Sequence, residues 1–426
     1  MKVTLDKTEG EVGNVAAAKT GFAAVRLRTF NSLRYRDYRF LWISILFMSG
    51  GQWMQQVALS WLVYQMTDSA FMLGAINGVG AIPFLIFGPW GGVAADRLDR
   101  KKLMLVTQAY LLVFTLGLAI LLLTGLLQVW HLFAFTFFTG LGWSFTMPAR
   151  QALIPSLVPR EDLVNAVGLQ STAFTSTRIL GPTAAGVLIA SIGPGLTFLL
   201  TSIAYLVILG LVAKIQIPAT LRDSSLTSPT QDLMEGFRYI GRNRTILYLI
   251  LLALIPMTFA MPFQSLLPVF ARDILKMGPE GYGALVSFAG AGALIGTLGV
   301  ASLGGYQRKG LLLLGSSIAM GLSLVLFSRS DWLPTSLLFM TLVGCFQMLY
   351  MSLNNTLLHA NITDDVRGRV MSIYMLDFGL TPLGSLFAGI TANFFGAPLA
   401  VTVMGSFCVT FGLIAILGVP RVRRMP

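Results

Sequence analysis

Charged side chains are crowded into one short stretch of this sequence. Only 11% of the 426 residues carry charge, yet the stretch DRLDRKK at 96–102 holds two acidic and four basic residues between two apolar runs. A carboxylate such as Asp96 can bond to the positive N-terminal end of a facing helix, and its basic neighbours can form charge-assisted hydrogen bonds to other segments. The stretch therefore predicts electrostatic contacts between helices. The alternative is a loop whose positive charge only sets membrane orientation.

Two further ionisable residues lie inside apolar runs. A charge at the centre of a bilayer costs about 2.5 to 3.5 kcal/mol on insertion scales, so Arg178 and Asp377 are functional candidates. Arg178, near the middle of its run, is expected to hold an anionic substrate or an internal carboxylate, or to bond helix carbonyls in a structural role. Asp377 is expected either to exchange protons as a cavity opens or to form a gating salt bridge.

Neutral polar side chains and two tryptophans within the apolar runs are candidates for lining a central passage. Their alternative role is interhelical hydrogen bonding, which contributes well under about 2 kcal/mol for each bond. The candidates are Gln52, Trp53, Gln55, Gln56, Trp143, Gln264, Gln347, Tyr350 and Asn354.

Sequence patterns typical of enzymes and ATP-driven pumps are absent. The chain contains no H-E-x-x-H, G-x-S-x-G or G-x-x-x-x-G-K-[ST] pattern, and His131 and His359 are expected at opposite membrane faces. Cys345 and Cys408 lie in apolar runs, which favours core packing over a disulfide or a metal site. We therefore expect no enzyme activity, no cofactor and no bound metal.

The composition and the apolar runs indicate a membrane protein. Hydrophobic residues make up 55% of the chain, and its mean hydropathy is +0.75. Twelve runs approach or exceed the roughly 20 apolar residues that cross a bilayer, and they lack the alternation of barrel strands, so they predict helices. The expected spans are 40–66, 69–95, 103–127, 130–154, 163–191, 195–217, 245–271, 281–304, 310–328, 332–358, 370–392 and 397–419.

The basic residues predict how these spans are oriented. All but four of the 30 lysines and arginines fall in segments on the side of the N-terminus, which the positive-inside rule places in the cytoplasm. The exceptions are Arg178, Arg272, Lys276 and Arg329. We therefore expect both termini in the cytoplasm of a bacterial cell and the protein in its inner membrane. The net charge of +12 then reflects membrane topology rather than nucleic-acid binding.

The longest connection divides the spans into two sets of six. The predicted order is a cytoplasmic N-terminal arm, a six-helix bundle, a cytoplasmic linker, a second six-helix bundle and a cytoplasmic tail, at 1–39, 40–217, 218–244, 245–419 and 420–426. The second part of the linker carries apolar and basic residues on opposite helical faces, which predicts a helix at the membrane surface. A solvated linker is the alternative.

A weak internal repeat indicates that the two halves are related. Aligning them places Gly181 and Gly186 on Gly384 and Gly389. Repeated halves are common in secondary transporters. The expected fold is therefore an all-α membrane protein whose twelve transmembrane helices form two pseudo-symmetric six-helix bundles.

The charged stretch resembles the signature loop of the major facilitator superfamily, G-x-x-x-D-R-x-G-R-[RK]. The matching residues are Gly92, Asp96, Arg97, Arg100 and Lys101. Asp99 stands where that family has glycine. The resemblance implies that these residues form a conformational gate, with the glycine allowing close helix approach. It also implies that spans 2 and 11 pack together, so that Asp377 can pair with Arg97 or Arg100.

Longer stretches are similar to the transmembrane secretion effector branch of this superfamily, which includes proteins resembling enterobactin exporters and macrolide efflux proteins. They include YRDYRFLWIS, MPARQALIPSLVPREDLVNAVGLQS and RILGPTAAG. Span 5 also resembles the antiporter signature G-x8-G-x3-G-P-x2-G-G through Gly168, Gly181, Pro182 and Gly186. Thr177 and Ala185 replace two of its glycines. The Gly-Pro pair is expected to bend the helix.

The resemblance implies export by alternating access around a central site. We expect a monomeric transporter, in contact with membrane lipid, that exchanges protons for a small amphipathic molecule of the siderophore or drug type. An importer or a lysophospholipid flippase of the same fold is the alternative, because a fold fixes neither direction nor substrate.

Overall fold

The described part of the chain folds into helices and short connections. The structure, a computed structural model, describes residues 30–216, 229–302, 306–363, 366–376, 381–423 and 425. The N-terminal half contains η1 (Asn31–Arg34), α2 (Arg36–Thr67), α3 (Ala70–Arg97), α4 (Arg100–Leu123), α5 (Val129–Leu157), η2 (Arg160–Asp162) and α6 (Leu163–Ala213). After α7 (Pro229–Arg242), the C-terminal half contains α8 (Arg244–Ile255), η3 (Pro256–Ala260), η4 (Met261–Leu266), α9 (Leu267–Val269), η5 (Phe270–Ile274), α10 (Pro279–Ser302), α11 (Lys309–Ser328), α12 (Leu333–Asn361), α13 (Arg367–Leu376), α14 (Thr381–Phe395), α15 (Ala397–Gly418) and α16 (Pro420–Arg423).

The expected spans 5 and 6 form one element with a sharp corner. Inside α6 the non-helical residue is Gly193, with φ 82° and ψ 165°. A positive φ strains any residue with a side chain, and Pro194, which follows, cannot donate a backbone hydrogen bond. The corner therefore divides α6 into two helical rods, between the expected runs 163–191 and 195–217.

Within the described residues, eight segments are long and apolar enough to cross a membrane, and the folded α6 counts as one of them. The helices α2 and α5 are as long but more polar, in α2 because Gln52, Gln55 and Gln56 interrupt the apolar sequence. The expected span 370–392 is divided between α13 and α14, and 377–380 lie outside the described residues. These helices agree with an all-α membrane protein, and the count of twelve spans remains a prediction.

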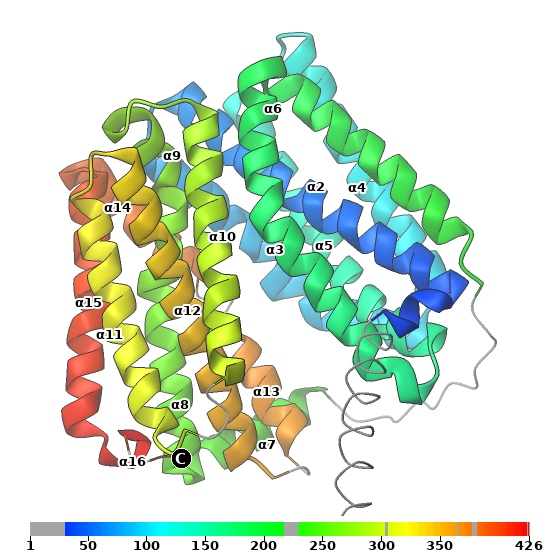
Figure 1. The fold of residues 1–426 in the computed structure, drawn as a ribbon. Coiled ribbons are helices and arrows are strands. Elements are labelled where there is room, and N and C mark those ends of the chain that lie inside the picture. The colour runs from blue at the N-terminus through cyan, green and yellow to red at the C-terminus, as the bar shows by residue number, and fades with distance from the viewer. Residues whose placement is uncertain are drawn as a thin grey trace, which may run out of the picture.

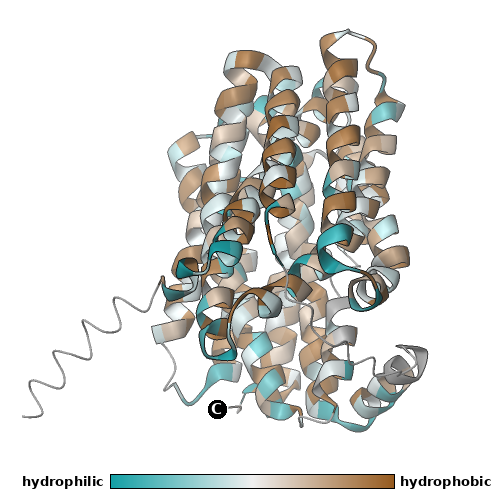
Figure 2. Ribbon diagram, turned by 90° about the vertical axis from the view of Figure 1, so that its right-hand side faces the viewer, coloured by the Kyte–Doolittle hydropathy of each residue, from teal (hydrophilic) through white to brown (hydrophobic). Residues whose placement is uncertain are grey.

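The two halves are separate bundles that converge at one end (Figure 1). In this view α6 and α10 approach each other near the top, whereas the lower ends of the bundles diverge. The long helices are apolar over most of their length, and hydrophilic residues gather toward helix ends and connections (Figure 2). We call the end that carries Tyr64 and Arg272 the joined end. The end that carries Asp96, α7 and α16 is called the signature end.

Buried apolar side chains form three clusters that are unevenly shared between the halves. One cluster lies at the joined end and contains residues of both halves, including Leu73 from α3 and Phe263 from η4. At the signature end each half has its own cluster, with Met104 in the N-terminal half and Leu353 in the C-terminal half. The halves therefore share a core at one end only.

Candidate transport pathway and its gates

Charged and aromatic groups bridge the two halves at the joined end. The Arg272 guanidinium donates to Asp68 at 2.5 Å and to Asp273 at 3.0 Å, and it lies 4.1 Å from the centre of the Tyr64 ring. The Tyr64 hydroxyl donates to the second carboxylate oxygen of Asp273. Tyr64 belongs to α2, and Asp68 ends that helix in the left-handed conformation, with φ 48°. These contacts attach α2 to η5 of the other half.

Glycines allow backbone contact between the halves at the same end. A Cβ atom on Gly186 of α6 would lie 2.6 Å from the carbonyl oxygen of Pro279 in α10. A Cβ atom on Gly389 of α14 would lie 2.8 Å from the carbonyl oxygen of Ala70 in α3. Helix association in a membrane depends on such close packing because lipid is as apolar as the helix surface. The internal repeat aligns Gly186 with Gly389, and the two glycines occupy matching interfaces.

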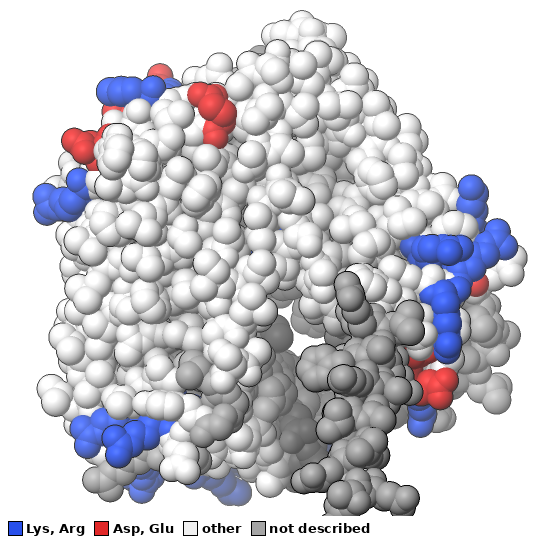
Figure 3. Space-filling model, in the orientation of Figure 1, with Lys and Arg blue, Asp and Glu red and all other residues white. Residues whose placement is uncertain are grey.

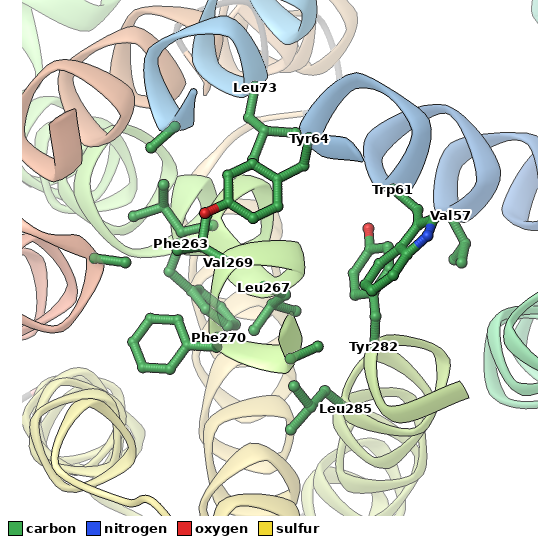
Figure 4. Close-up of a cluster of buried hydrophobic side chains, with 14 of the residues drawn as sticks. Val57, Trp61, Tyr64, Leu73, Phe263, Leu267, Val269, Phe270, Tyr282 and Leu285 are labelled. Atoms are coloured by element: carbon green, nitrogen blue, oxygen red, sulfur yellow. The ribbon is translucent and has the colours of Figure 1, made fainter. Parts of the chain in front are cut away.

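Buried side chains fill the remaining space between the halves at the joined end (Figure 4). Trp61 of α2 faces Tyr282 of α10, and Phe263 lies in the same apolar cluster. Trp61 is 8% exposed and Tyr282 is 3% exposed. Together with the charge cluster, these side chains close the joined end.

The basic signature residues make their contacts inside the N-terminal half. Arg100 donates to a carbonyl oxygen of α5 and to the hydroxyl of Ser156, both at 3.0 Å. Lys101 donates to two carbonyl oxygens at the end of α6, at 2.8 and 2.7 Å. Such carbonyls have no partner within their own helix. Arg100 and Lys101 therefore fasten α4 to its neighbours in the same bundle.

Asp99, which stands where the family pattern has glycine, begins α4 as its N-cap. Its backbone is extended, with φ −65° and ψ 113°, which any residue can adopt. Its carboxylate accepts a hydrogen bond from the Lys102 N–H at 3.0 Å. Because aspartate is among the best N-cap residues, this departure from the family pattern keeps a regular turn.

Gly92 and Asp96 face open space in this conformation. A Cβ atom on Gly92 would meet no atom within 4 Å, whereas one on Gly91 would overlap the carbonyl oxygen of Ser144 in α5. Successive helical residues point about 100° apart, so Gly92 points away from α5. Asp96 and Arg97 are exposed, and Asp96 accepts no hydrogen bond from a described residue. In this conformation Gly91 makes the close approach to α5, and the role expected of Gly92 in the gate stays a prediction.

A polar cavity of about 90 Å³ lies between the halves, next to the closed joined end. Gln56 and Gln264 line it from opposite halves, as expected for a central passage, and none of its described lining residues is charged. The other polar lining residues are Trp53, Ser60, Asn77, Ser265, Tyr282, Thr381 and Ser385. Sites for drug-sized ligands have volumes of roughly 300 Å³ or more, so this cavity is only part of a pathway. Figure 3 shows the surface hollowed between the halves toward the signature end.

Arg178 lies beside this cavity with an aromatic partner. It is midway between Leu163, where α6 begins, and the corner at Gly193. Its guanidinium carbon is 6.0 Å from the ring centre of Trp53, which lines the cavity. No acidic group or carbonyl among the described residues pairs with its guanidinium. A partly buried arginine of this kind keeps its donors available for an anionic group.

The Gly-Pro segment of α6 packs against both halves. A Cβ atom on Gly181 would lie 2.9 Å from the Cβ of Trp53. The carbonyl oxygen of Pro182 contacts Gly283 of α10 so closely that no side chain fits there. The backbone remains helical through this segment. The expected bend at Pro182 therefore remains a prediction, and the observed role is close packing.

Several candidates lie within one half rather than at the cavity. Gln55 is buried and donates to Thr115 at 2.7 Å, and it accepts from Tyr205 at 3.3 Å, which is interhelical hydrogen bonding. Gln347 and Tyr350 line a second cavity of about 10 Å³ in the C-terminal half, together with four methionines.

Three other candidates are also placed away from the central cavity. Asn354 is fully buried, and neither atom of its amide has a partner among the described residues. Trp143 packs against the apolar cluster of the N-terminal half at the signature end. Gln52 is partly buried and does not line the central cavity.

Arg150 is a buried charge that the apolar pattern did not single out. It lies on α5 and is 5% exposed, its Nη2 is 3.1 Å from the sulfur of Met147, and its Nε has no partner among the described residues. The sequence signal for Arg150 was its position inside the expected span 130–154. It lies one turn from the end of that run, where an arginine can also set the membrane orientation. The sequence alone therefore did not distinguish a buried functional charge from an orientation signal.

Asp377 lies outside the described residues, so both of its expected roles remain hypotheses. Thr381, at the start of α14, lines the cavity. Among the described residues, no group of three His, Cys, Asp or Glu side chains is close enough to hold a metal ion.

One family model matches nearly the whole length of the sequence. This model, described as a transmembrane secretion effector, matches residues 27–425. The chain belongs to this family. The family is a branch of the major facilitator superfamily, so this protein is a membrane transporter and not an enzyme.

Relatives of this transporter include siderophore and drug transporters. It is 27% identical over 367 residues to the staphyloferrin A transporter of Staphylococcus aureus, covering 84% of this chain and 91% of the relative. It is 28% identical over 374 residues to macrolide efflux protein A of Streptococcus pyogenes, covering 84% and 90%. The expected family is therefore confirmed.

The fold of this transporter matches those of solved transporter structures. A bacterial homologue of the human lysosomal transporter Spinster, in an inward-facing and occupied conformation, superposes with a TM-score of 0.73 at 15% sequence identity. The match covers 92% of this chain and 99% of that one. The expected all-α major facilitator fold is therefore confirmed.

Proposed function

We propose that this transporter exports a small amphipathic molecule with an anionic group in exchange for protons. The two halves alternate between conformations that open the central cavity at one end or the other. The structure is closed at the joined end, so in this proposal it represents the conformation that opens toward the signature end.

The uneven distribution of buried clusters is the observation that carries this proposal. The halves share one apolar cluster at the joined end and keep separate clusters at the signature end. A rigid bundle would bury a common core along its whole length. Two bundles with separate cores can instead move as rigid bodies, exchanging contacts at one end for contacts at the other.

The polar character of the cavity supports the substrate class. Gln56 and Gln264 supply neutral hydrogen-bonding groups from both halves, and Trp53 supplies an aromatic face. Arg178, next to Trp53, supplies a positive charge without an acidic partner among the described residues. An amphipathic anion would match these groups, since a charged partner offsets the cost of keeping an arginine partly buried.

The placement of basic residues supports the membrane orientation. In the proposal, the signature end faces the cytoplasm of a bacterial cell, both termini are cytoplasmic, and the protein lies in the inner membrane as a monomer. The signature end carries most of the lysines and arginines, as the positive-inside rule requires of a cytoplasmic face. Export then loads substrate from the cytoplasm in the observed conformation and releases it after the joined end opens.

Transport into inverted membrane vesicles tests export and coupling together. Labelled staphyloferrin A and a labelled macrolide are suitable probes, because relatives are named for them. An imposed proton gradient should drive accumulation of at least one probe in inverted vesicles. Accumulation only in right-side-out vesicles would favour an importer and refute the proposal.

Two substitutions test the assigned roles of charged residues. Asp377→Asn should abolish accumulation against the gradient and preserve equilibrative exchange, while the exposed Asp331→Asn should leave both unchanged. Arg178→Gln should weaken binding of an anionic probe, and the exposed Arg160→Gln should not. Uphill transport by Asp377→Asn at the normal rate would contradict proton coupling at this residue.

A further inference from the structure

A third cavity, which is wide open to the surface and has a basic lining, lies at the signature end of the C-terminal half. It has a volume of about 600 Å³ and is lined by Tyr239, Arg242, Asn243, Arg244, Thr245 and Arg421. These residues come from the end of α7, the start of α8 and α16. We call this cavity the arginine groove. It is distant from the central cavity, with which it shares no lining residue.

Three arginines from three segments converge on the arginine groove. Arg242, Arg244 and Arg421 are exposed, and none of them forms an ion pair or a hydrogen bond with a described residue. The neighbouring ion pair of α7 uses a different residue, because Arg369 of α13 bonds to Glu235 at 2.8 Å. Like charges repel, so an anion bound between these arginines would stabilise their arrangement.

The groove arginines, rather than a bare helix end, provide this anion-binding character. The first free N–H groups of α8 are already satisfied, because the Asn243 side chain accepts from Thr245 N at 3.1 Å and from Ile246 N at 3.4 Å. Arginine is suited to phosphate because its planar guanidinium can donate two parallel hydrogen bonds. The groove therefore favours a phosphate group over a diffuse counterion.

Exposed apolar side chains on α7, the helix that also contributes to the groove lining, point to the source of the phosphate. α7 packs Ile240 into the core of the C-terminal half, while Met234 and Phe237 on the same helix are 63% and 54% exposed. A helix with exposed apolar and basic residues at a bundle end is typical of the boundary between lipid headgroups and acyl chains. A phospholipid supplies acyl chains for Met234 and Phe237 and a phosphate for the arginines.

We propose that the arginine groove binds the headgroup of an anionic phospholipid from the leaflet at the signature end. This lipid connects the linker helix α7, the start of α8 and the C-terminal segment α16. It occupies a site separate from the transported molecule, so the proposal does not depend on which substrate is exported. Each basic side chain near the headgroup should raise the affinity of the protein for an anionic lipid about fivefold.

Native mass spectrometry of the purified full-length protein tests the lipid site. Phosphatidylglycerol and phosphatidylcholine with identical acyl chains serve as probes, and the dissociation constant of the first bound lipid is measured for each. The wild type should prefer phosphatidylglycerol by more than tenfold. Arg421→Gln should weaken phosphatidylglycerol binding about fivefold, and the triple replacement of Arg242, Arg244 and Arg421 by Gln should weaken it about a hundredfold.

A matched triple variant separates a built site from general positive charge. Replacing Arg238, Arg308 and Arg423 by Gln removes the same charge from the same end without changing the groove lining. This control should keep the wild-type preference. Equal losses in both triple variants, or equal binding of the two lipids by the wild type, would overturn the proposal. If inorganic phosphate bound the groove as tightly as phosphatidylglycerol, the lipid assignment would also fail. The single Arg421→Gln variant decides the matter if a triple variant does not fold.

Discussion

The packing of Gly74 at the joined end predicts how one added methyl group changes the conformational equilibrium. Gly74 lies on α3, and a Cβ atom there would overlap the carbonyl oxygen of Ser385 and lie 3.2 Å from the Cα of Leu386, both in α14. Both obstacles belong to the backbone, so a side-chain rotation cannot relieve them. Gly74→Ala should therefore destabilise the closed joined end and favour its opening.

The size of this shift follows from separating two effects of Gly74→Ala. Alanine stabilises a helix by about 1 kcal/mol over glycine, but α3 is helical in both conformations, so this gain cancels from the equilibrium between them. Overpacking costs about 1–3 kcal/mol and acts only where α3 touches α14. The population open at the joined end should therefore rise by about 5-fold to 150-fold.

Electron–electron distance measurements between two spin labels can detect this shift. Leu126 and Trp332 lie in exposed connections at the joined end, one in each half, with 66% and 62% exposure. Cysteines at these two positions carry the labels after Cys345 and Cys408 have been replaced. The distance distribution of Gly74→Ala should gain a longer component that the parent protein lacks or populates weakly.

A control glycine distinguishes the packing effect from a general effect of alanine. Gly315 lies on α11, is exposed, and has no atom within 4 Å of an added Cβ. Gly315→Ala should leave the distance distribution unchanged. If Gly74→Ala also leaves it unchanged, or if Gly315→Ala shifts it equally, contact between α3 and α14 does not control opening of the joined end.

Three further substitutions test the gates, two of them with the same label pair and the third by vesicle transport. Gly92→Ala should shift the distances opposite to Gly74→Ala, because its added Cβ meets open space in the observed conformation and we expect it to meet a facing helix in the alternate one; a shift in the same direction would contradict this. Arg272→Gln should remove partly exposed ion pairs and a cation–π contact, which together contribute about 1–2 kcal/mol. The population that is open at the joined end should then rise about 5-fold to 30-fold, and Arg272→Lys should raise it less. Asp96→Asn should slow vesicle transport about 2-fold to 30-fold, because we expect this carboxylate to bond a helix end in the alternate conformation; normal turnover would assign the signature loop to topology alone.

The apolar runs predicted the fold because length and polarity alone decide whether a segment can cross a bilayer. They could not predict the irregular backbone of α8 to η5, where Pro256, Pro262 and Pro268 interrupt the hydrogen-bond ladder and π and 3-10 segments replace a regular helix. Each proline was visible in the sequence. A run of apolar residues does not reveal, however, how neighbouring helices satisfy the freed carbonyls.

The cavity residues were harder to predict because adjacent helical positions face different neighbours. Gln55 and Gln56 are consecutive, yet Gln55 bonds Thr115 within the N-terminal half and Gln56 lines the central cavity. Both are glutamines in the same apolar run, so the composition does not distinguish them. Only the rotation of α2 within its bundle determines which of the two faces the cavity. The same holds for Gln264, which reaches the cavity, and Gln347, which does not.

One face of α3 connects the two gates. Gly74 and Gly92 are eighteen residues apart, which is five helical turns, so they lie on the same face of α3. Gly74 is in tight contact with α14 at the joined end, while a Cβ on Gly92 would meet open space at the signature end. Turnover requires both conformations to lie within a few kcal/mol of each other. Opening the joined end loses the contact at Gly74, and an equivalent contact at Gly92 would compensate for it. A rocking motion of α3 against its partner helix would therefore exchange one glycine contact for the other and keep the two conformations close in free energy.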